Sequence, residues 1–297
     1  MKRHLFLTIK TLCISAMLVL SACNKDEVIE ISVGGDDNVY CTRVLDFSPA
    51  PGQFINRLTT SSDPAEALAA AERVLTSPQG YVSLGGFGGY VVVGFDRSIA
   101  NSGGYDFAVL GNSFDNASEP GIVWVMRDDN GNGVPDDTWY ELRGSEYDSP
   151  DTQFGYEVTY FRPSDNSPDV SWSDNRGETG VIKRAYYPSW IESDSYTLAG
   201  SRLAARNEDT SGGTAQEYWE NRNYEWGYAD NFSQVDMPDG DGYNYFRLSN
   251  AVDADGRSVN LPSADFVKIQ CAVNASSGWL GEISTEVFTV KVCNTAE

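Results

Sequence analysis

Short runs of β-branched and aromatic residues, separated by glycine and polar turn residues, dominate the hydrophobic pattern of the chain. Few stretches with a helical period lie between these runs, so the pattern favours antiparallel strands over βαβ units. We therefore predict a mostly β fold, an antiparallel, jelly-roll-like β-sandwich with one N-terminal helix. The predicted strands lie at residues 81–84, 90–95, 105–110, 122–126, 139–142, 156–161, 243–248, 266–271 and 287–292.

One helix is well marked near the N-terminal end of this pattern. Asp63 is a suitable N-cap, Pro64 suits the first helical position, and Glu66 stands where a capping box places a carboxylate. Residues 65–75 are good helix formers, and they end before a Ser-Pro pair at 77–78. The sequence therefore predicts a single helix at 65–75.

A long aromatic-rich insertion is predicted at about residues 145–240, where the strand pattern fades. Its large rings either pack a small accessory core or form an exposed platform on which a flat ligand stacks, and the sequence leaves both alternatives open. The candidate ligand-binding residues are Tyr187, Trp190, Trp219, Tyr224 and Trp226.

The N-terminus has the pattern of a bacterial lipoprotein signal, with basic residues, an apolar stretch at 11–20 and the lipobox Leu-Ser-Ala-Cys at 20–23. The apolar stretch is about half of the roughly 20 residues that span a bilayer, which argues against a permanent transmembrane helix. The predicted segments are a signal peptide at 1–22, lipidation at Cys23, a tether at 23–39 and a single β-sandwich domain at 40–297 that carries the insertion.

A possible export signal follows the lipidation site. Lys25 precedes the acidic pair Asp26 and Glu27. In lipoproteins of Bacteroidetes, such a group beside the lipidated cysteine resembles the signal for the outer leaflet of the outer membrane. We therefore predict a lipid-anchored outer-membrane protein exposed on the cell surface, with an ordinary solvated tether as the alternative.

The charge of the chain excludes several classes of function. Its 43 Asp and Glu outnumber its 21 Lys and Arg, and its formal net charge is −22, so no nucleic-acid partner is expected. The single histidine, His4, lies in the predicted signal peptide. The mature protein would therefore have no histidine for a Ser-His-Asp triad, a Cys-His pair, a general base or a His-ligated zinc site.

Three cysteines besides Cys23 remain in the predicted mature chain, namely Cys41, Cys271 and Cys293. An odd set in an exported protein allows one disulfide and one free thiol, and the sequence does not choose among the three pairings. Buried structural cysteines without a disulfide are the alternative.

The sharpest local chemistry is the loop Asp-Asp-Asn-Gly-Asn-Gly-Val-Pro-Asp-Asp at 128–137. Counted from Asp128, its oxygen donors and second glycine follow the order of an EF-hand calcium loop. Trp139 stands at position 12, where a bidentate glutamate belongs, which leaves Asp137 or Glu141 for the last ligand. An Asx-rich turn is the alternative to a calcium site. The candidate calcium ligands are Asp128, Asn130, Asn132, Val134, Asp136 and Asp137.

Several motifs give the chain a family resemblance from about residue 80 to 290. They lie at 83–89, 106–112, 119–125, 128–137, 226–231, 251–256 and 278–282. Together they resemble a family of Bacteroidetes cell-surface lipoproteins, often described only as PKD-domain-associated cell-surface proteins. Surface lipoproteins similar to these occur in corrinoid (vitamin B12) uptake loci and bind the vitamin, so the resemblance implies a small-molecule ligand.

Two classes of function therefore compete. The first is a non-catalytic surface lipoprotein that binds a small-molecule nutrient, with a corrinoid implied by the resemblance, for delivery to a TonB-dependent outer-membrane transporter. The second is a carbohydrate-binding lipoprotein or a glycoside hydrolase, which would use two carboxylates about 5 to 9 Å apart. No such pair can be identified in so acidic a sequence, and we expect no enzyme activity.

Overall fold

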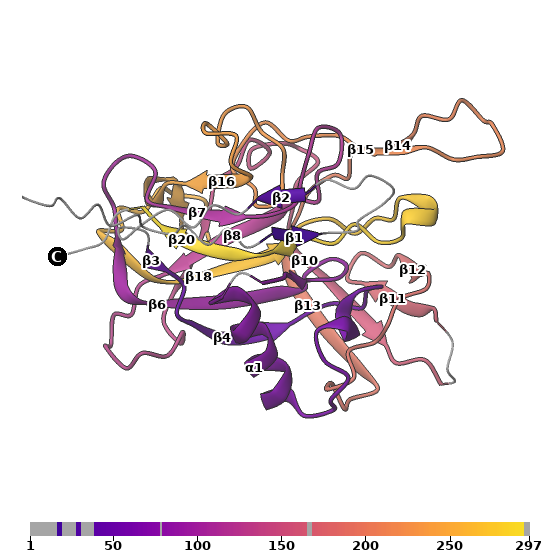
Figure 1. Ribbon diagram of the computed structural model, residues 1–297, viewed down its shortest axis with the longest axis horizontal. Helices are drawn as coiled ribbons and strands as arrows, with labels where there is room; N and C mark the ends of the chain where they lie inside the picture. The colour runs from indigo at the N-terminus through magenta and orange to yellow at the C-terminus, as the bar shows by residue number, and fades with distance from the viewer. Residues whose placement is uncertain (1–16, 20–27, 31–38, 78, 165–167, 294–297) are drawn as a thin grey trace, which may run out of the picture. The chain divides into compact units, whose positions relative to one another are not determined.

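The computed structural model describes residues 17–19, 28–30, 39–77, 79–164 and 168–293 (Figure 1). It divides into two units, Met1–Asp37 and Asn38–Glu297. In the first unit, β1 (Met17–Val19) pairs antiparallel with β2 (Val28–Glu30). The predicted lipidation site Cys23 and the predicted export signal lie outside the described residues. No helix in the described part of the chain is long and apolar enough to cross a membrane.

The largest sheet of the second unit has six antiparallel strands in the order β17-β9-β8-β18-β6-β4. Alternation along the central strands turns Val123 and Val125 of β8, like Val267 and Ile269 of β18, into the main hydrophobic core. The strands are β4 (Arg43–Ser48), β6 (Tyr90–Ala100), β8 (Gly121–Met126), β9 (Trp139–Leu142), β17 (Ala251–Val252) and β18 (Ser263–Cys271).

A four-stranded sheet in the order β16-β7-β20-β3 forms the second layer of the sandwich. Its buried residues, such as Val109 and Val290, join one hydrophobic cluster with Val93 and Ile269 of the six-stranded sheet. The prediction of an antiparallel β-sandwich is therefore confirmed. The strands are β3 (Val39–Tyr40), β7 (Phe107–Leu110), β16 (Tyr243–Phe246) and β20 (Thr289–Val292).

The predicted helix is confirmed as α1 (Pro64–Leu75). The Asp63 carboxylate caps it by accepting a hydrogen bond from the Ala65 amide at 2.9 Å. Its apolar face joins the sandwich core through Ala67, Ala71 and Leu75. Glu72 Oε2 accepts a hydrogen bond from the Val44 amide at 3.0 Å, so the helix also covers part of the edge strand β4 (Figure 1).

The aromatic-rich segment is more regular than its sequence suggests. It contains a four-stranded antiparallel sheet in the order β12-β11-β10-β13 and a hairpin of β14 and β15. Sequence analysis found only part of β10, because the other strands carry Ser, Thr, Gly and Asp, which weaken the strand signal. The strands are β10 (Gln153–Phe161), β11 (Val170–Asp174), β12 (Thr179–Ile182), β13 (Ser195–Arg202), β14 (Asn207–Asp209) and β15 (Trp219–Asn221).

This third sheet packs on the outer face of the six-stranded sheet. Tyr160 Oη donates a hydrogen bond to the Phe87 carbonyl at 2.8 Å, inside a second hydrophobic cluster. Gln270 of β18 donates through Nε2 to the Ala199 carbonyl of β13 at 3.0 Å. Gly200 makes this approach possible, since a Cβ there would lie 2.2 Å from Gln270 Oε1. One part of the outer face is therefore covered by the third sheet.

The remaining elements are short. β5 (Val82–Ser83) pairs antiparallel with β19 (Glu286–Val287). Figure 1 shows the loop between β14 and β15 reaching away from the other strands of the second unit. Three 3-10 turns complete the fold, η1 (Ile55–Arg57), η2 (Leu248–Asn250) and η3 (Gly278–Leu280).

Candidate ligand-binding site

A row of polar and aromatic side chains crosses the outer face of the six-stranded sheet. The strand register pairs Trp124 of β8 with Glu141 of β9 on one side and with Lys268 of β18 on the other. Lys268 in turn pairs with Val92 of β6, and Val92 pairs with Asp46 of β4. Residues paired across strands point to the same face, so five strands place these side chains in one line.

Three aromatic rings surround the ammonium group of Lys268. Its Nζ atom lies 4.6 Å from the ring centroid of Trp124, 5.3 Å from that of Trp139 and 5.8 Å from that of Tyr90. All four side chains are partly buried. A cation this close to ring faces is attracted by their π electrons. We call this group, Tyr90, Trp124, Trp139 and Lys268, the tryptophan–lysine face.

The face rests on a small apolar layer. Val92, Met126 and Phe266 are buried beneath it, and Leu45, Tyr90 and Trp139 pack against them. The same alternation that turns the valines of β8 inward turns Trp124 and Met126 outward. A rigid sheet therefore fixes the directions of the rings, which lowers the entropy lost when a ligand stacks on them.

The ionisable groups of the face are perturbed by burial. Burial lowers the pKa of Lys268 to about 8, against a smaller opposing effect of the Glu141 and Asp46 carboxylates. Burial raises the pKa of Glu141 to about 7, although the hydroxyl of Ser201 donates a hydrogen bond to its Oε2 atom at 2.5 Å. Tyr90 Oη donates to Asp46 Oδ2 at 2.7 Å. Two groups on one face thus titrate near neutral pH.

Polar donors of the face lack partners within the described chain. The Lys268 ammonium makes no hydrogen bond and no ion pair with a described residue, and the buried Trp124 Nε1 has no acceptor there. Arg43 Nε, on β4, is also buried without a hydrogen-bond partner among the described residues. An unsatisfied buried donor costs free energy.

The predicted calcium loop connects β8 to β9 at the border of this face. Asp128 accepts hydrogen bonds from the amides of Gly131, Asn132 and Gly133 at 2.8 to 3.1 Å. Gly133 has a φ of +73°, which explains why a glycine is needed at position six of the loop. Arg43 Nη1 lies 3.9 Å from the position that a Cβ on Gly133 would occupy, so the loop approaches the tryptophan–lysine face.

The predicted calcium ligands are brought together only in part. Asn130 and Asn132 each donate a side-chain hydrogen bond to Asp136 Oδ1, at 3.0 and 3.2 Å, so these three side chains converge. The Val134 carbonyl accepts from the Asp136 amide, and Asp137 Oδ2 accepts from the amide of Asp129, both at 2.9 Å. Within the described chain, no group of three or more His, Cys, Asp or Glu residues is placed to hold a metal ion. The Asn130 and Asn132 side chains face Asp136 through their amide nitrogens, and their Oδ1 atoms accept the Asn132 and Val134 amides at 2.9 and 2.7 Å, the bonds of an Asx-rich turn.

The five aromatic candidates from the sequence do not form one surface. Tyr187 lies in the cluster beneath the third sheet, Trp190 in the sandwich core and Tyr224 in a third cluster, each with at most 8% of its surface exposed. Trp219 and Trp226 are partly buried. Three of the rings therefore serve as core residues in separate places.

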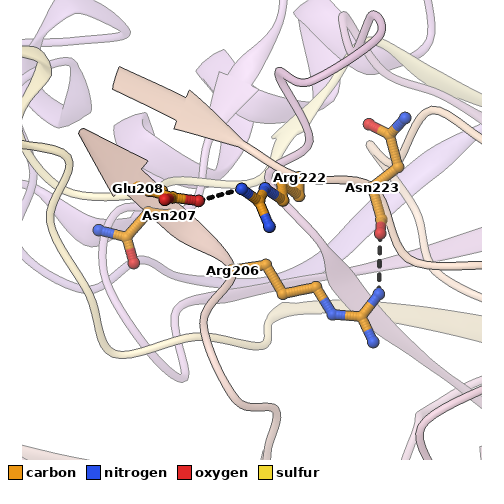
Figure 2. A pocket seen from close by; sticks show the side chains of 5 residues that line it. All are labelled: Arg206, Asn207, Glu208, Arg222 and Asn223. Atoms are coloured by element: carbon orange, nitrogen blue, oxygen red, sulfur yellow. Dashed lines mark hydrogen bonds and ion pairs between the residues drawn. The ribbon is translucent and has the colours of Figure 1, made fainter. Parts of the chain in front are cut away.

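Two surface hollows lie near the β14–β15 hairpin. One, of about 510 Å³, is lined by Arg206, Asn207, Glu208, Arg222 and Asn223 (Figure 2). Figure 2 shows Arg222 paired with Glu208 and Arg206 donating to the Asn223 carbonyl. The other, of about 550 Å³, is lined by Ala215, Gln216, Glu217, Gly278 and Trp279. Both arginines of the first hollow already have partners, which makes it a weaker candidate than the tryptophan–lysine face.

A buried group of carboxylates lies elsewhere in the sandwich. Asp230 accepts hydrogen bonds from the amides of Glu286 and Asn112, at 2.8 and 2.9 Å, and the Asn112 side chain donates to Glu286. Burial and the neighbouring acids raise the pKa of Glu286 to about 8, and burial raises that of Asp230 and of Glu282 to about 7. Burial and the same neighbours also raise the pKa of Glu119. These acids therefore link distant segments of the chain, either as protonated carboxyl groups or as acceptors of hydrogen bonds.

The three cysteines are free thiols. Cys41 and Cys271 are buried and Cys293 is exposed, so the structure forms no disulfide among them. Burial raises the pKa of Cys271 to about 11, which makes this thiol unreactive.

Sequence reasoning missed the residues of the tryptophan–lysine face. The signal was a polar or bulky residue at the centre of an apolar strand, Lys268 between Val267 and Ile269 and Trp124 between Val123 and Val125. Alternation places such residues on the face opposite the core. Their convergence needed the register of four strands, which the sequence does not show.

No protein-family model matches the chain, and no curated protein matches it in sequence. The resemblance to surface lipoproteins of Bacteroidetes therefore stays a prediction. The functional argument depends on the geometry of the tryptophan–lysine face and on the N-terminal signals.

Proposed function

We propose that this chain is a lipid-anchored protein of the outer membrane that captures a small-molecule nutrient at the cell surface. The observation that carries the proposal is the arrangement of Trp124, Trp139 and Tyr90 around the ammonium of Lys268, which forms no ion pair with a described residue. Rings held by a rigid sheet next to unsatisfied polar donors are the usual composition of a small-molecule site. The lipobox at Cys23 and the signal at 25–27 support the location.

The captured nutrient would pass to a TonB-dependent transporter in the same membrane. A corrinoid is the ligand that the family resemblance implies, and its broad, flat, partly apolar ring suits two tryptophan side chains on a sheet. Capture at the surface would raise the local concentration of a scarce ligand beside the transporter.

Carbohydrate binding is the second candidate. Sugar rings present apolar faces that pack on tryptophan and tyrosine, and the amphipathic rings of the face would supply that contact. Glu141, Asp46 and Lys268, in the same row, would supply hydrogen bonds to hydroxyl groups. A glycan ligand would therefore use the same face as a corrinoid.

Hydrolysis of a glycan finds less support at this face. Glu141 and Asp46 stand at opposite ends of the row, on β9 and β4, with three strands between them. Four strand spacings separate their backbones by about 19 Å, whereas a hydrolase pair needs about 5 to 9 Å. We therefore propose a binding protein and not an enzyme.

Calcium is proposed as a structural ion in the 128–137 loop. Asn130, Asn132 and Asp136 would hold it, together with Asp128 and the Val134 carbonyl, and hard oxygen donors suit this ion. The ion would neutralise the acidic side chains of the loop and order the border of the tryptophan–lysine face.

Binding measurements on purified protein test the proposed function. Calorimetry with cyanocobalamin and with a panel of glycans should find one ring-bearing ligand, and Trp124→Ala or Trp139→Ala should each weaken it by roughly tenfold or more. Trp279→Ala, which removes a half-exposed tryptophan near the second hollow, is the matched control. Full affinity in both Trp124→Ala and Trp139→Ala would overturn the assignment of the site.

A further inference from the structure

Two basic residues, Lys268 of the tryptophan–lysine face and Arg43 at its border, form no ion pair with a described residue, although the Glu141 and Asp46 carboxylates attract Lys268 from farther away. Seven described basic residues form ion pairs, and the other described Lys and Arg residues form none with described acids. Lys268 and Arg43 form none with described residues, although both are partly buried. Burying a cation without a partner costs free energy, so an anionic ligand would gain most here.

The two cations lie close enough to contact one ligand. Arg43 of β4 pairs with Gly94 of β6, Gly94 pairs with Phe266 of β18, and Lys268 follows two residues later on the same face. Strand geometry separates the Cα atoms of Arg43 and Lys268 by about 12 Å. A ligand the size of a disaccharide, or one larger ring, spans that distance.

The absence of a side chain at Gly94 leaves room for the side chain of Arg43 on the outer face of β6. A Cβ on Gly94 would lie 2.9 Å from Arg43 Nε and 3.3 Å from its Cγ, so the arginine side chain lies across β6. Its Nε atom is buried there and has no acceptor among the described residues. The guanidinium is therefore held over the sheet and does not extend freely into solvent.

We propose that the tryptophan–lysine face binds a ring-shaped ligand that carries an anionic group, with Lys268 as the residue that holds the anion and Arg43 as a second donor. The inference rests on the proposed function, because it names the class of ligand for the same face. The rings would pack on the ligand, the ammonium would pair with its carboxylate, sulfate or phosphate group, and the Trp124 indole would donate to a further oxygen. Lys268 thus supplies selectivity and the rings supply most of the contact area.

Matched ligand pairs test this proposal on the wild-type protein. Trigalacturonic acid and its methyl ester differ in the charge of their sugar carboxyl groups, and dicyanocobinamide lacks the nucleotide of cyanocobalamin, including its phosphodiester. We expect the protein to bind one of these two pairs. Within that pair, the anionic ligand should bind about tenfold or more tightly than the other ligand, which is the difference in affinity that a charged hydrogen bond provides. Its advantage should shrink as salt rises from 20 to 500 mM, since salt screens the pairing of charges.

Variants assign the effect to a residue. Lys268→Met keeps the apolar stem and should remove at least about tenfold of affinity for the anionic member, while the other member changes by less than about twofold. Arg43→Gln should have a smaller effect of the same kind. Lys183→Gln is the matched control, because Lys183 is an exposed lysine paired with Asp169. Melting curves check that each variant is folded, and the wild-type comparison does not depend on them.

The outcomes separate the two proposals. Equal affinity for both members of the pair that binds, with no effect of Lys268→Met, would overturn the anionic ligand and leave capture on the face intact. Ligand binding that is unaffected by Trp124→Ala and Trp139→Ala would overturn the face itself, and both proposals with it. The pair that binds, either the galacturonates or the corrinoids, identifies the source of the anion.

Discussion

Lys268 and Glu141 stand on either side of Trp124, because each pairs with this tryptophan across one of the two strands that flank β8. The two groups form no ion pair within 4 Å, but the carboxylate and the ammonium attract each other electrostatically. Their pKa values, about 8 for Lys268 and about 7 for Glu141, are both displaced toward neutrality by burial. The charge of the face therefore changes within the range in which binding is usually measured.

Affinity for an anionic ligand should fall as pH rises. Near pH 6, Glu141 is largely protonated and Lys268 is charged, so the face favours an anion. Above pH 7 the Glu141 carboxylate repels the ligand, and above pH 8 the Lys268 ammonium loses its proton. Asp46 is a further carboxylate in the row. Tyr90 stays protonated because burial raises its pKa. Calorimetry from pH 6 to 9 should show a decrease of at least about tenfold.

Glu141→Gln separates the two steps of this pH dependence. The variant should lose the decrease near pH 7 and keep the decrease near pH 8. A flat profile in the wild-type protein would contradict the assignment of Lys268 and Glu141 to the site.

Calcium should raise the melting temperature of the wild-type protein. An ion that binds only the folded state stabilises it by about 2.7 kcal/mol at a hundred times its dissociation constant. The variant with Asp128→Ala and Asp136→Ala should keep no calcium response, whatever its melting temperature without the ion. Differential scanning calorimetry with calcium and with EDTA measures both. An equal calcium response of the variant and the wild type would show that calcium does not bind in this loop.

Trp190 and Trp124 should respond to truncation in opposite ways. Trp190 is 4% exposed and its ring centroid lies 5.8 Å from that of Phe47 in the sandwich core, so Trp190→Ala should cost about 3 to 5 kcal/mol of unfolding free energy. Trp124→Ala should cost less stability and more affinity. Urea unfolding gives the stability of both variants, and calorimetry gives their affinity for the ligand. A loss of affinity without unfolding in Trp190→Ala would favour the aromatic insertion over the tryptophan–lysine face as the binding site.

The buried carboxylates should make the protein less stable as pH rises. Burial raises the pKa of Glu286 to about 8 and that of Asp230 and Glu282 to about 7, well above the ordinary range of these groups. Stability that is present below their unfolded pKa values is therefore lost as pH rises toward 8. Glu286→Gln should add about 1 kcal/mol or more at pH 8 and little at pH 5. Exposed Glu66→Gln is the control, and a pH-independent effect of Glu286→Gln would argue against this account.

The proposed location can be tested in intact cells. Cys23→Ala should release the protein from membranes, whereas replacing Lys25, Asp26 and Glu27 with alanine should leave it lipidated and hide it from added protease. Immunoblots of membrane fractions and of protease-treated cells measure the two effects. Unchanged accessibility of the triple variant would show that these residues are an ordinary tether.

The sequence predicted the elements whose signals are local. Asp63, Pro64 and the alanines that follow specify a helix without help from the rest of the chain, and valine-rich runs such as β8 specify central strands. The strands β11 to β13 were missed because their stability comes from packing around Phe87 and from the contact of Gln270 with β13, which are non-local. The tryptophan–lysine face was missed for the same reason, since Trp124, Trp139 and Lys268 meet only through strand register.

The hydrogen bond from the Val44 amide to Glu72 would matter if the protein is lipid-anchored, as proposed above. Val44 lies on β4, an edge strand of the six-stranded sheet, and its neighbour Leu45 lies at a bulge in the register. Free edges invite strands from neighbouring molecules to add to a sheet. Lipid anchors confine molecules to two dimensions, where collisions between equally oriented copies are frequent. In such a layer, a helix carboxylate that occupies an edge amide, next to a bulge, would help to keep lipid-anchored copies from associating edge to edge.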